Sequence, residues 1–211
     1  MNSTVFSFGL ILAAYLLGSL SGSLLLGKLR GVDIRTQGSG NAGGTNAFRT
    51  QGAKFALGVI VIDIGKGALA AWLGLRFAQG ADATWVPYAT AFAASIGHVW
   101  PVWHGFRGGK GAATVVGGVL MLWPAAVPIL LAVWLCGLIL TGYVGLSTVF
   151  AGISLVVLAL TTHADAIRLV FAVAVAVLLL FTHRANLARL RAGTESRFEK
   201  ARLLHRLARR A

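Results

Sequence analysis

Six long apolar stretches dominate this sequence and constrain its fold more than any other feature. They cover residues 4–27, 55–77, 84–102, 112–141, 143–161 and 166–182. A helix needs about 20 mostly apolar residues to cross the hydrocarbon core of a bilayer. Charged residues are only 12% of the 211 residues, and a soluble domain carries roughly 25%. The sequence therefore predicts an all-α integral membrane protein whose single domain spans residues 1–211.

The fourth apolar stretch, residues 112–141, is too long to be one straight spanning helix. It contains Trp123-Pro124 and Pro128, and proline interrupts the hydrogen bonding of a helix. A split near Trp123-Pro124 predicts seven transmembrane helices, some of them short. The alternative is five spans, with part of this region lying on the membrane.

The basic residues are concentrated in three polar segments, which predicts the orientation of the chain. These segments are residues 28–54, 103–111 and the tail from residue 184 onward, whereas residues 76–83 carry only Arg76 and Asp82. Cytoplasmic loops of membrane proteins are enriched in Lys and Arg. We therefore expect the three basic segments in the cytoplasm, the N-terminus outside and the C-terminus inside. For residues 197–211 the sequence predicts either a basic amphipathic surface helix or a solvated tail.

Acidic residues and cysteine are scarce, which argues against a metal site. The chain has 19 Lys and Arg against six acids, for a net charge of +13. The six acids do not cluster as Mg²⁺ or Ca²⁺ would require. The only cysteine, Cys136, lies in an apolar stretch, where we expect a small buried hydrophobic residue.

The first polar segment contains the glycine-rich sequence GSGNAGGTNAFR at residues 38–49. Glycine lets backbone N–H groups converge on an anion because no Cβ blocks the approach. The guanidinium of Arg49 adds a charged fork suited to phosphate. The pattern favours a phosphate-binding loop over a flexible connector. Its candidate residues are Gly38, Ser39, Gly40, Asn41, Ala42, Gly43, Thr45, Asn46 and Arg49.

A second glycine-rich sequence, at residues 97–114, combines aromatic residues with cations. Arg107 and Lys110 flank a run of glycines, and the cations and glycines together form the candidate site. A helix starting at about Gly111 would point its N-terminal N–H groups at an anion. His98 is either a general base or a hydrogen-bonded interfacial histidine. The candidate residues here are His98, Arg107, Gly108, Gly109, Lys110 and Gly111.

Polar residues also occur in two further places. Asp63 and Lys66 lie three residues apart within an apolar stretch, hence on one helical face. They either neutralise each other, or Lys66 contributes to the anion site. In the third polar segment, Glu195 is expected to pair with a nearby arginine, while Asn186 follows a long apolar stretch with no obvious orienting role.

Two glycine-rich loops with cations on one side of an apolar bundle predict two phosphate-bearing ligands. One of them is expected to be amphiphilic, because the site lies at the lipid boundary. Neutralising the charge of a phosphate leaving group can supply much of the catalysis of an acyl transfer. An anion transporter is the rival interpretation, although the sequence lacks the internal repeats typical of transporters. A lipid-binding scaffold would not explain two glycine-rich loops.

The sequence resembles the bacterial acyl-phosphate:glycerol-3-phosphate acyltransferases over essentially its whole length. Three motifs carry the resemblance, at residues 38–49, 97–111 and 186–195. The departures are mild: Trp100 and Trp103 stand where phenylalanine is usual, and Arg107 stands where lysine is usual. None of them removes a polar group.

The resemblance implies a seven-helix enzyme that makes lysophosphatidate at the start of bacterial phospholipid synthesis. It implies transfer of a fatty acyl group from acyl phosphate to the 1-hydroxyl of glycerol 3-phosphate, with no acyl-enzyme intermediate. By match, Ser39 and Arg49 are essential, Asn186 is a site residue, and Lys110 with the second glycine-rich loop binds glycerol 3-phosphate. The expected place is the bacterial cytoplasmic (inner) membrane, with the active site facing the cytoplasm. Besides acyl phosphate, glycerol 3-phosphate and membrane lipids, we expect no cofactor, metal, nucleic acid or obligate protein partner.

Overall fold

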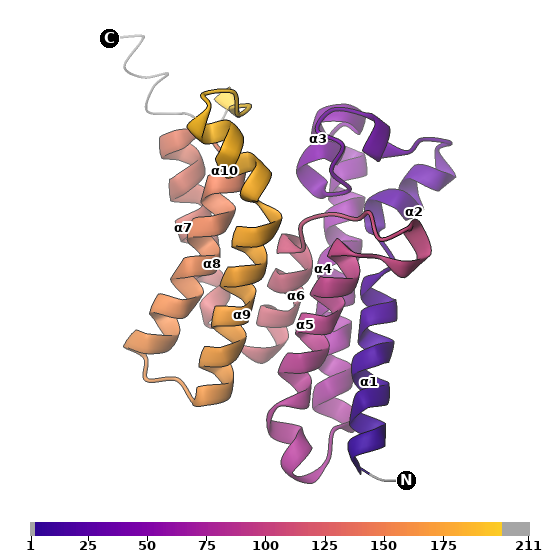
Figure 1. Ribbon diagram of the computed structural model, residues 1–211, viewed down its shortest axis with the longest axis vertical. Helices are drawn as coiled ribbons and strands as arrows, with labels where there is room; N and C mark the ends of the chain where they lie inside the picture. Colours follow the sequence, from indigo (N-terminus) through magenta and orange to yellow (C-terminus); the bar gives the residue numbers. More distant parts are fainter. Residues whose placement is uncertain (1–2, 200–211) are drawn as a thin grey trace. The chain divides into compact units, whose positions relative to one another are not determined.

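The computed structural model describes residues 3–199, which are entirely helical in their regular structure (Figure 1). No strand occurs among these residues, which confirms the all-α prediction. The chain divides into two compact units, Met1–Pro124 and Ala125–Ala211. The surface helix predicted for residues 197–211 falls almost wholly outside the described residues. The single domain expected for residues 1–211 stays a prediction.

The first unit is built around α4, its longest helix. Helices α1, α2, α3, α5 and α6 all pack against α4, and α5 also packs against α1 and α6. The helices of this unit are α1 (Ser3–Gly18), α2 (Gly22–Leu29), α3 (Gly44–Gln51), α4 (Ala53–Phe77), α5 (Val86–Val99) and α6 (Ala112–Leu122). Three short 3-10 turns connect them, namely η1 (Ile34–Thr36), η2 (Gly80–Thr84) and η3 (Val102–His104).

Glycines let the helices of the first unit approach to backbone contact. A Cβ on Gly67 of α4 would overlap the backbone of Thr114 in α6. A Cβ on Gly18 of α1 would overlap the backbone of Ala94 in α5 in the same way. Small residues at helix contacts are typical of membrane proteins, where close van der Waals packing replaces the hydrophobic effect as the force that joins helices.

The first predicted span, residues 4–27, is not one helix, which corrects the sequence-based expectation. Helix α1 ends at Gly18 and α2 begins at Gly22, with a bend of 45° between them. The break leaves backbone groups that need partners in an apolar environment. The Leu20 carbonyl accepts a hydrogen bond from Lys66 Nζ (2.9 Å), and the Gly22 amide donates one to Asp63 Oδ1 (3.1 Å). Charged residues of α4 therefore stabilise the break.

The second unit contains four helices in its described part, up to residue 199, with α8 packed against the other three. Helix α8 (Val144–Thr161) packs against α7 (Ala126–Thr141) and α9 (Ala166–Thr182), and α10 (Arg184–Arg191) contacts α8 and α9. Helix α10 follows α9 with a bend of 54°. Because α6 ends at Leu122 and α7 begins at Ala126, the predicted split of residues 112–141 is confirmed. Cys136 is exposed on α7, so the expectation that it is buried is wrong.

Helix lengths within residues 3–199 agree with the predicted number of helices. The described residues contain seven helices of 11 to 25 residues, namely α1, α4, α5, α6, α7, α8 and α9. Two of them, α4 and α8, are long and apolar enough to span by themselves, and the bent pairs α1–α2 and α9–α10 raise this number to four. Seven crossings and the orientation of the termini remain predictions.

The glycine contact between α4 and α6 leads to a test of stability. Gly67→Ala places a methyl group against the Thr114 backbone, and overpacking of this kind costs about 1–3 kcal/mol. Gly65→Ala, on the same helix, is the matched control, because a Cβ at Gly65 would meet no atom within 4 Å. Thermal unfolding in detergent should show a lower Tm for Gly67→Ala and an unchanged or higher Tm for Gly65→Ala. Equal Tm values for the two variants would contradict the close contact.

Candidate functional site

The first glycine-rich loop is held in a fixed conformation by the side chain of Asn46. Asn46 is 1% exposed. Its Nδ2 donates to the carbonyls of Ile34 and Gln37 (3.0 Å each), and its Oδ1 accepts from the Ser39 amide (2.9 Å). Gly38 lies in the left-handed region with φ of 56°, which glycine adopts without steric cost. The loop is therefore not a flexible connector, and the amide of Asn46 is fully used inside it.

The side chains of Ser39 and Arg49 are among those of this first segment that remain available to a ligand. Ser39 lies in the loop and Arg49 in the last turn of α3, and both are exposed. Within residues 3–199, the Ser39 hydroxyl and the Arg49 guanidinium form no hydrogen bond or ion pair. The segment therefore presents a hydroxyl and a guanidinium beside a pre-formed glycine loop, and these groups suit a phosphate.

The second glycine-rich loop uses two of its own amides to fold. The Gly108 amide donates to the Val99 carbonyl and the Gly109 amide to the His98 carbonyl, both at 3.1 Å. These amides are engaged within the segment, which differs from the expectation that they face an anion. Helix α6 begins at Ala112 after Gly111, whose φ is 86°. The predicted helix start at about Gly111 is confirmed.

Gly109 brings the two glycine-rich loops together in the first unit. A Cβ at Gly109 would overlap His98 Nε2 and would lie 2.8 Å from the Ala42 carbonyl oxygen. Ala42 is completely buried, and Gly109 is also buried. Only glycine fits between the histidine ring and the first loop. A Cβ here would collide first with the protein itself.

A buried cluster of three ionisable side chains lies beneath this contact. Lys66 Nζ is 3.0 Å from Asp63 Oδ1 and 2.8 Å from His98 Nδ1, and it also bonds to the Leu20 carbonyl. The side chains of Asp63 and Lys66 are 2% and 4% exposed. Mutual neutralisation of Asp63 and Lys66, one of the two interpretations left open by the sequence, is therefore what the structure shows. Lys66 Nζ thus has three polar neighbours, namely Asp63 Oδ1, His98 Nδ1 and the Leu20 carbonyl oxygen.

His98 faces both charged side chains of this cluster. Its Nδ1 lies 2.8 Å from Lys66 Nζ and 3.3 Å from Asp63 Oδ1. The ammonium favours a Nδ1 that accepts, whereas the carboxylate favours a Nδ1 that carries the proton and donates. Nε2 is the atom that approaches Gly109. The role of His98 as a general base stays a prediction.

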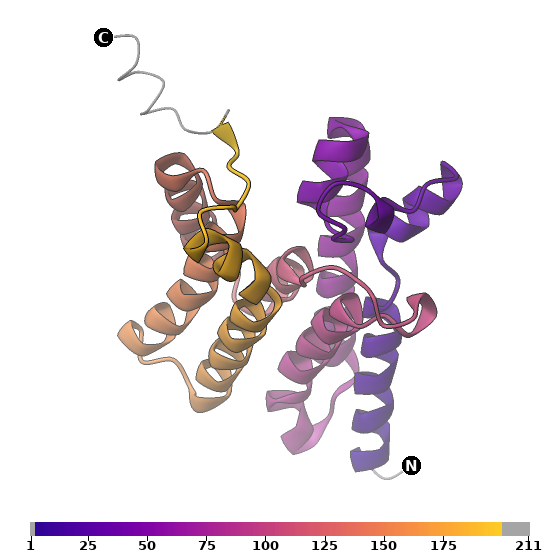
Figure 2. The ribbon, with the colours of Figure 1, turned by 45° about the horizontal axis from the view of Figure 1, so that its top comes forward.

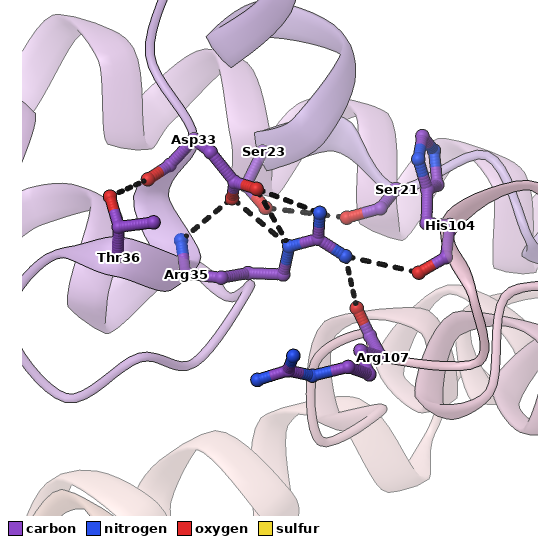
Figure 3. A network of polar contacts seen from close by, with 7 residues as sticks. All are labelled: Ser21, Ser23, Asp33, Arg35, Thr36, His104 and Arg107. Atoms are coloured by element: carbon purple, nitrogen blue, oxygen red, sulfur yellow. Dashed lines mark hydrogen bonds and ion pairs between the residues drawn. The ribbon is translucent and has the colours of Figure 1, made fainter.

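A second network joins the polar segment before the first loop to the second loop (Figure 3). Arg35 forms an ion pair with Asp33 (Nη2 to Oδ2, 2.7 Å), and its Nη1 donates to the carbonyls of His104 (3.0 Å) and Arg107 (3.2 Å). The hydrogen bond from Arg35 lowers the pKa of Asp33, and the same bond raises the pKa of Arg35. Burial lowers the pKa of His104. The Asp-x-Arg pattern of residues 33–35, shortly before the glycine-rich loop, was the usable signal for this network in the sequence.

The third motif forms a separate cluster in the second unit. Asn186 Nδ2 donates to Glu195 Oε1 (2.6 Å), and Arg189 Nε donates to Glu195 Oε2 (2.7 Å). The expected pairing of Glu195 with an arginine is confirmed. A Cβ at Gly145 would crowd the Asn186 side chain. A buried histidine that the sequence did not single out, His183, lies just before the motif, and its Nδ1 contacts the Leu179 carbonyl at the α9–α10 bend.

The predicted site residues thus fall into two sets. The first unit contains both glycine-rich loops, and their contact at Gly109 brings these loops together at one end of the unit, away from the N-terminus (Figures 1 and 2). The second unit contains the pair Asn186 and Glu195. Among residues 3–199, no group of three or more His, Cys, Asp or Glu side chains could hold a metal ion.

Comparison with known proteins gives a consistent result over most of the chain. The sequence profile of the family described as glycerol-3-phosphate acyltransferase matches residues 8–193. The glycerol-3-phosphate acyltransferase of Symbiobacterium thermophilum is 42% identical over 183 residues, which are 87% of this chain and 90% of the relative.

Two solved structures of PlsY (YgiH), an integral membrane glycerol 3-phosphate acyltransferase, share the fold. The glycerol 3-phosphate form aligns with a TM-score of 0.85 and 36% identity, over 91% of this chain and 95% of that one. The lysophosphatidic acid form aligns with a TM-score of 0.82 and 35% identity, over 90% and 94%.

The buried cluster predicts a strong dependence of stability on Asp63. Asp63→Ala leaves the Lys66 ammonium buried without its counter-ion, and breaking a buried pair in this way costs about 3–5 kcal/mol. Asp63→Ala/Lys66→Met removes the uncompensated charge and should recover part of the loss. Thermal unfolding in detergent checks both variants. A double variant that is less stable than Asp63→Ala would show that the ammonium is not compensated by Asp63.

Proposed function

The chain belongs to the glycerol-3-phosphate acyltransferase family of integral membrane proteins, and on this basis we propose that its acyl donor is acyl phosphate. The acyl group passes to the 1-hydroxyl of glycerol 3-phosphate. The products are 1-acylglycerol 3-phosphate (lysophosphatidate) and inorganic phosphate. Membership of an acyltransferase family also removes the ground for the rival interpretation as an anion transporter.

The contact between the two glycine-rich loops is the observation that carries this proposal. Gly109 of the second loop packs against Ala42 of the first, so two sets of anion-binding groups lie at one end of one unit. Both proposed reactants carry phosphate, and each loop suits one phosphate. The donor's phosphate is also the leaving group, so fixed positive charge beside it stabilises the charge that develops as the bond breaks.

We assign the charge stabilisation to Arg49 and Lys110. Arg49 is exposed beside the first loop, and Lys110 is half-buried directly before Gly111 and the start of α6. The N-terminus of α6 adds backbone N–H groups and the positive end of the helix dipole. The Ser39 hydroxyl supplies a neutral hydrogen bond to the same ligand. These groups hold two anions close together and convert their encounter into a reaction within one complex.

The proposed step needs no covalent intermediate on the enzyme. The hydroxyl oxygen of glycerol 3-phosphate attacks the acyl carbon, and the bond between that carbon and the phosphate oxygen breaks. The hydroxyl proton passes to a phosphate oxygen of a substrate. His98 is the alternative proton acceptor in this scheme. Its Nδ1 lies 2.8 Å from Lys66 Nζ and 3.3 Å from Asp63 Oδ1, and its Nε2 approaches Gly109.

The third motif completes the proposed site residues. We assign Asn186 to the site from its match to the family motif, with Glu195 and Arg189 fixing its orientation. The family profile spans residues 8–193 and so includes both compact units, which supports a single catalytic domain. The positive charge of the three polar segments supports a cytoplasm-facing site in the bacterial inner membrane. We propose seven crossings, membrane lipids as neighbours and no obligate protein partner.

The donor is tested by incubating the purified protein in detergent or nanodiscs with glycerol 3-phosphate and one of three donors. Long-chain acyl phosphate should yield lysophosphatidate and phosphate in equal amounts. Acyl coenzyme A and acyl carrier protein are the comparison donors, and we expect no product with either. Turnover with a thioester and none with acyl phosphate would refute the proposed donor.

The assigned cations predict a matched pair of losses. Arg49→Ala and Lys110→Ala should each lower kcat/KM by about 100- to 1,000-fold, the scale seen when one group that stabilises the developing charge is removed. Lys54→Ala is the control, since it removes one positive charge from an exposed position near Arg49. Its rate should stay close to that of the wild type. The assignment fails if either site variant keeps the control's rate while all three proteins retain the wild-type Tm.

A further inference from the structure

Arg35 touches both glycine-rich loops, although it belongs to neither. Its backbone lies in η1, and a Cβ at Gly40 of the first loop would lie 3.3 Å from the Arg35 carbonyl oxygen. Its side chain extends to the second loop, where Nη1 donates to the carbonyls of His104 and Arg107. These contacts cross separations of 69 and 72 residues along the chain. One residue therefore spans the distance between the two loops.

The two carbonyls held by Arg35 lie on either side of a strained turn. Gly105 and Phe106, between them, both have left-handed backbones with φ of 63° and 59°. A bulky residue such as phenylalanine rarely adopts this conformation and keeps it only where the surroundings impose it. Phe106 is 56% exposed, so side-chain packing does not impose it. Hydrogen bonds hold the turn instead: the Phe106 amide donates to the Pro101 carbonyl (2.9 Å), and the Arg35 guanidinium bonds to the carbonyls of both flanking residues.

Asp33 orients the guanidinium for this task. It accepts from Arg35 Nε and Nη2, with distances of 3.0 Å to Oδ1 and 2.7 Å to Oδ2. It also accepts from the Arg35 amide (2.9 Å) and so caps η1. The carboxylate binds one edge of the guanidinium and leaves Nη1 pointing at the second loop (Figure 3). Lysine could not replace Arg35, because an ammonium lacks the planar fork that bonds to a carboxylate and two carbonyls together.

We propose that Arg35, oriented by Asp33, is a positioning residue that sets the spacing and shape of the two glycine-rich loops and thereby the affinity for glycerol 3-phosphate. We place Arg35 outside the reacting groups, because four of its five N–H donors bond to Asp33 and to the two carbonyls. The proposal rests on the assignment of the second loop to glycerol 3-phosphate. It adds to the site a residue that lies outside the three motifs on which the family resemblance was built.

The first test is a kinetic comparison with full-length protein. Arg35→Ala and Arg35→Lys should each raise the KM for glycerol 3-phosphate by about tenfold or more, the factor expected when hydrogen bonds from a charged donor are lost. The kcat should change by less than about threefold, because transition-state groups remain in place. Asp33→Ala should shift the KM in the same direction. Lys28→Ala, which removes an exposed charge nearby, should leave both constants unchanged.

The second test reads the loop directly and does not depend on turnover. Amide hydrogen exchange followed by mass spectrometry should be faster across residues 104–109 in Arg35→Ala and Arg35→Lys than in the wild type. Exchange within α4 and α5 should be unchanged. A merely structural role for Arg35 would instead accelerate exchange throughout the first unit and lower the Tm.

The outcomes separate this proposal from the proposed function. Unchanged exchange at residues 104–109 in Arg35→Ala overturns the positioning role, even if the wild type turns over acyl phosphate as proposed. Full recovery of KM by Arg35→Lys also overturns it, because charge alone would then be sufficient. Local acceleration of exchange in a protein whose wild type does not use acyl phosphate would support the role of Arg35 in the loop and refute only the donor.

Discussion

The buried contact of Asp63, Lys66 and His98 is the interaction on which the rest of the first unit depends. Charges inside an apolar bundle are stable only when each has a partner. Here Asp63 and Lys66 neutralise each other and also bond to the two backbone groups released where α1 ends and α2 begins. Lys66 further fixes the ring of His98, which supports Gly109. A single cluster thus joins the broken first helix, α4, α5 and the second glycine-rich loop.

The glycines of the site serve two different physical purposes. Gly38 permits a left-handed backbone, so that the first loop can fold around the Asn46 side chain. Gly109 permits close approach, since any side chain there would overlap the His98 ring. Both uses give a rigid loop rather than a mobile one. A rigid arrangement is what catalysis by charge stabilisation requires, because the donors are then already oriented when the substrates bind.

Much of the fold followed from the sequence, and the failures concern what a residue contacts outside its own helix. The ends of α8 and α9 and the break at Trp123-Pro124 depend on local composition and were predictable. The bend at Ser19–Ser21 was missed because its stabilising partners lie on another helix. The exposed Cys136 was missed because apolar residues in a membrane protein can face lipid as well as the core. The presence of the glycine-rich loops was predictable from the sequence, but the hydrogen bonds that the Gly108 and Gly109 amides form within the second loop were not.

The sequence by itself determined the all-α membrane class, the positions of the long helices and the two loops rich in glycine and cations, since each depends on residues that are neighbours in the chain. Only the tertiary structure decided that Lys66 contacts His98, that Gly109 contacts Ala42, and that Arg35 holds the carbonyls of the second loop. These contacts join residues 32 to 72 positions apart. No local pattern specifies such pairs, because they form only when packed helices bring distant segments to the same place.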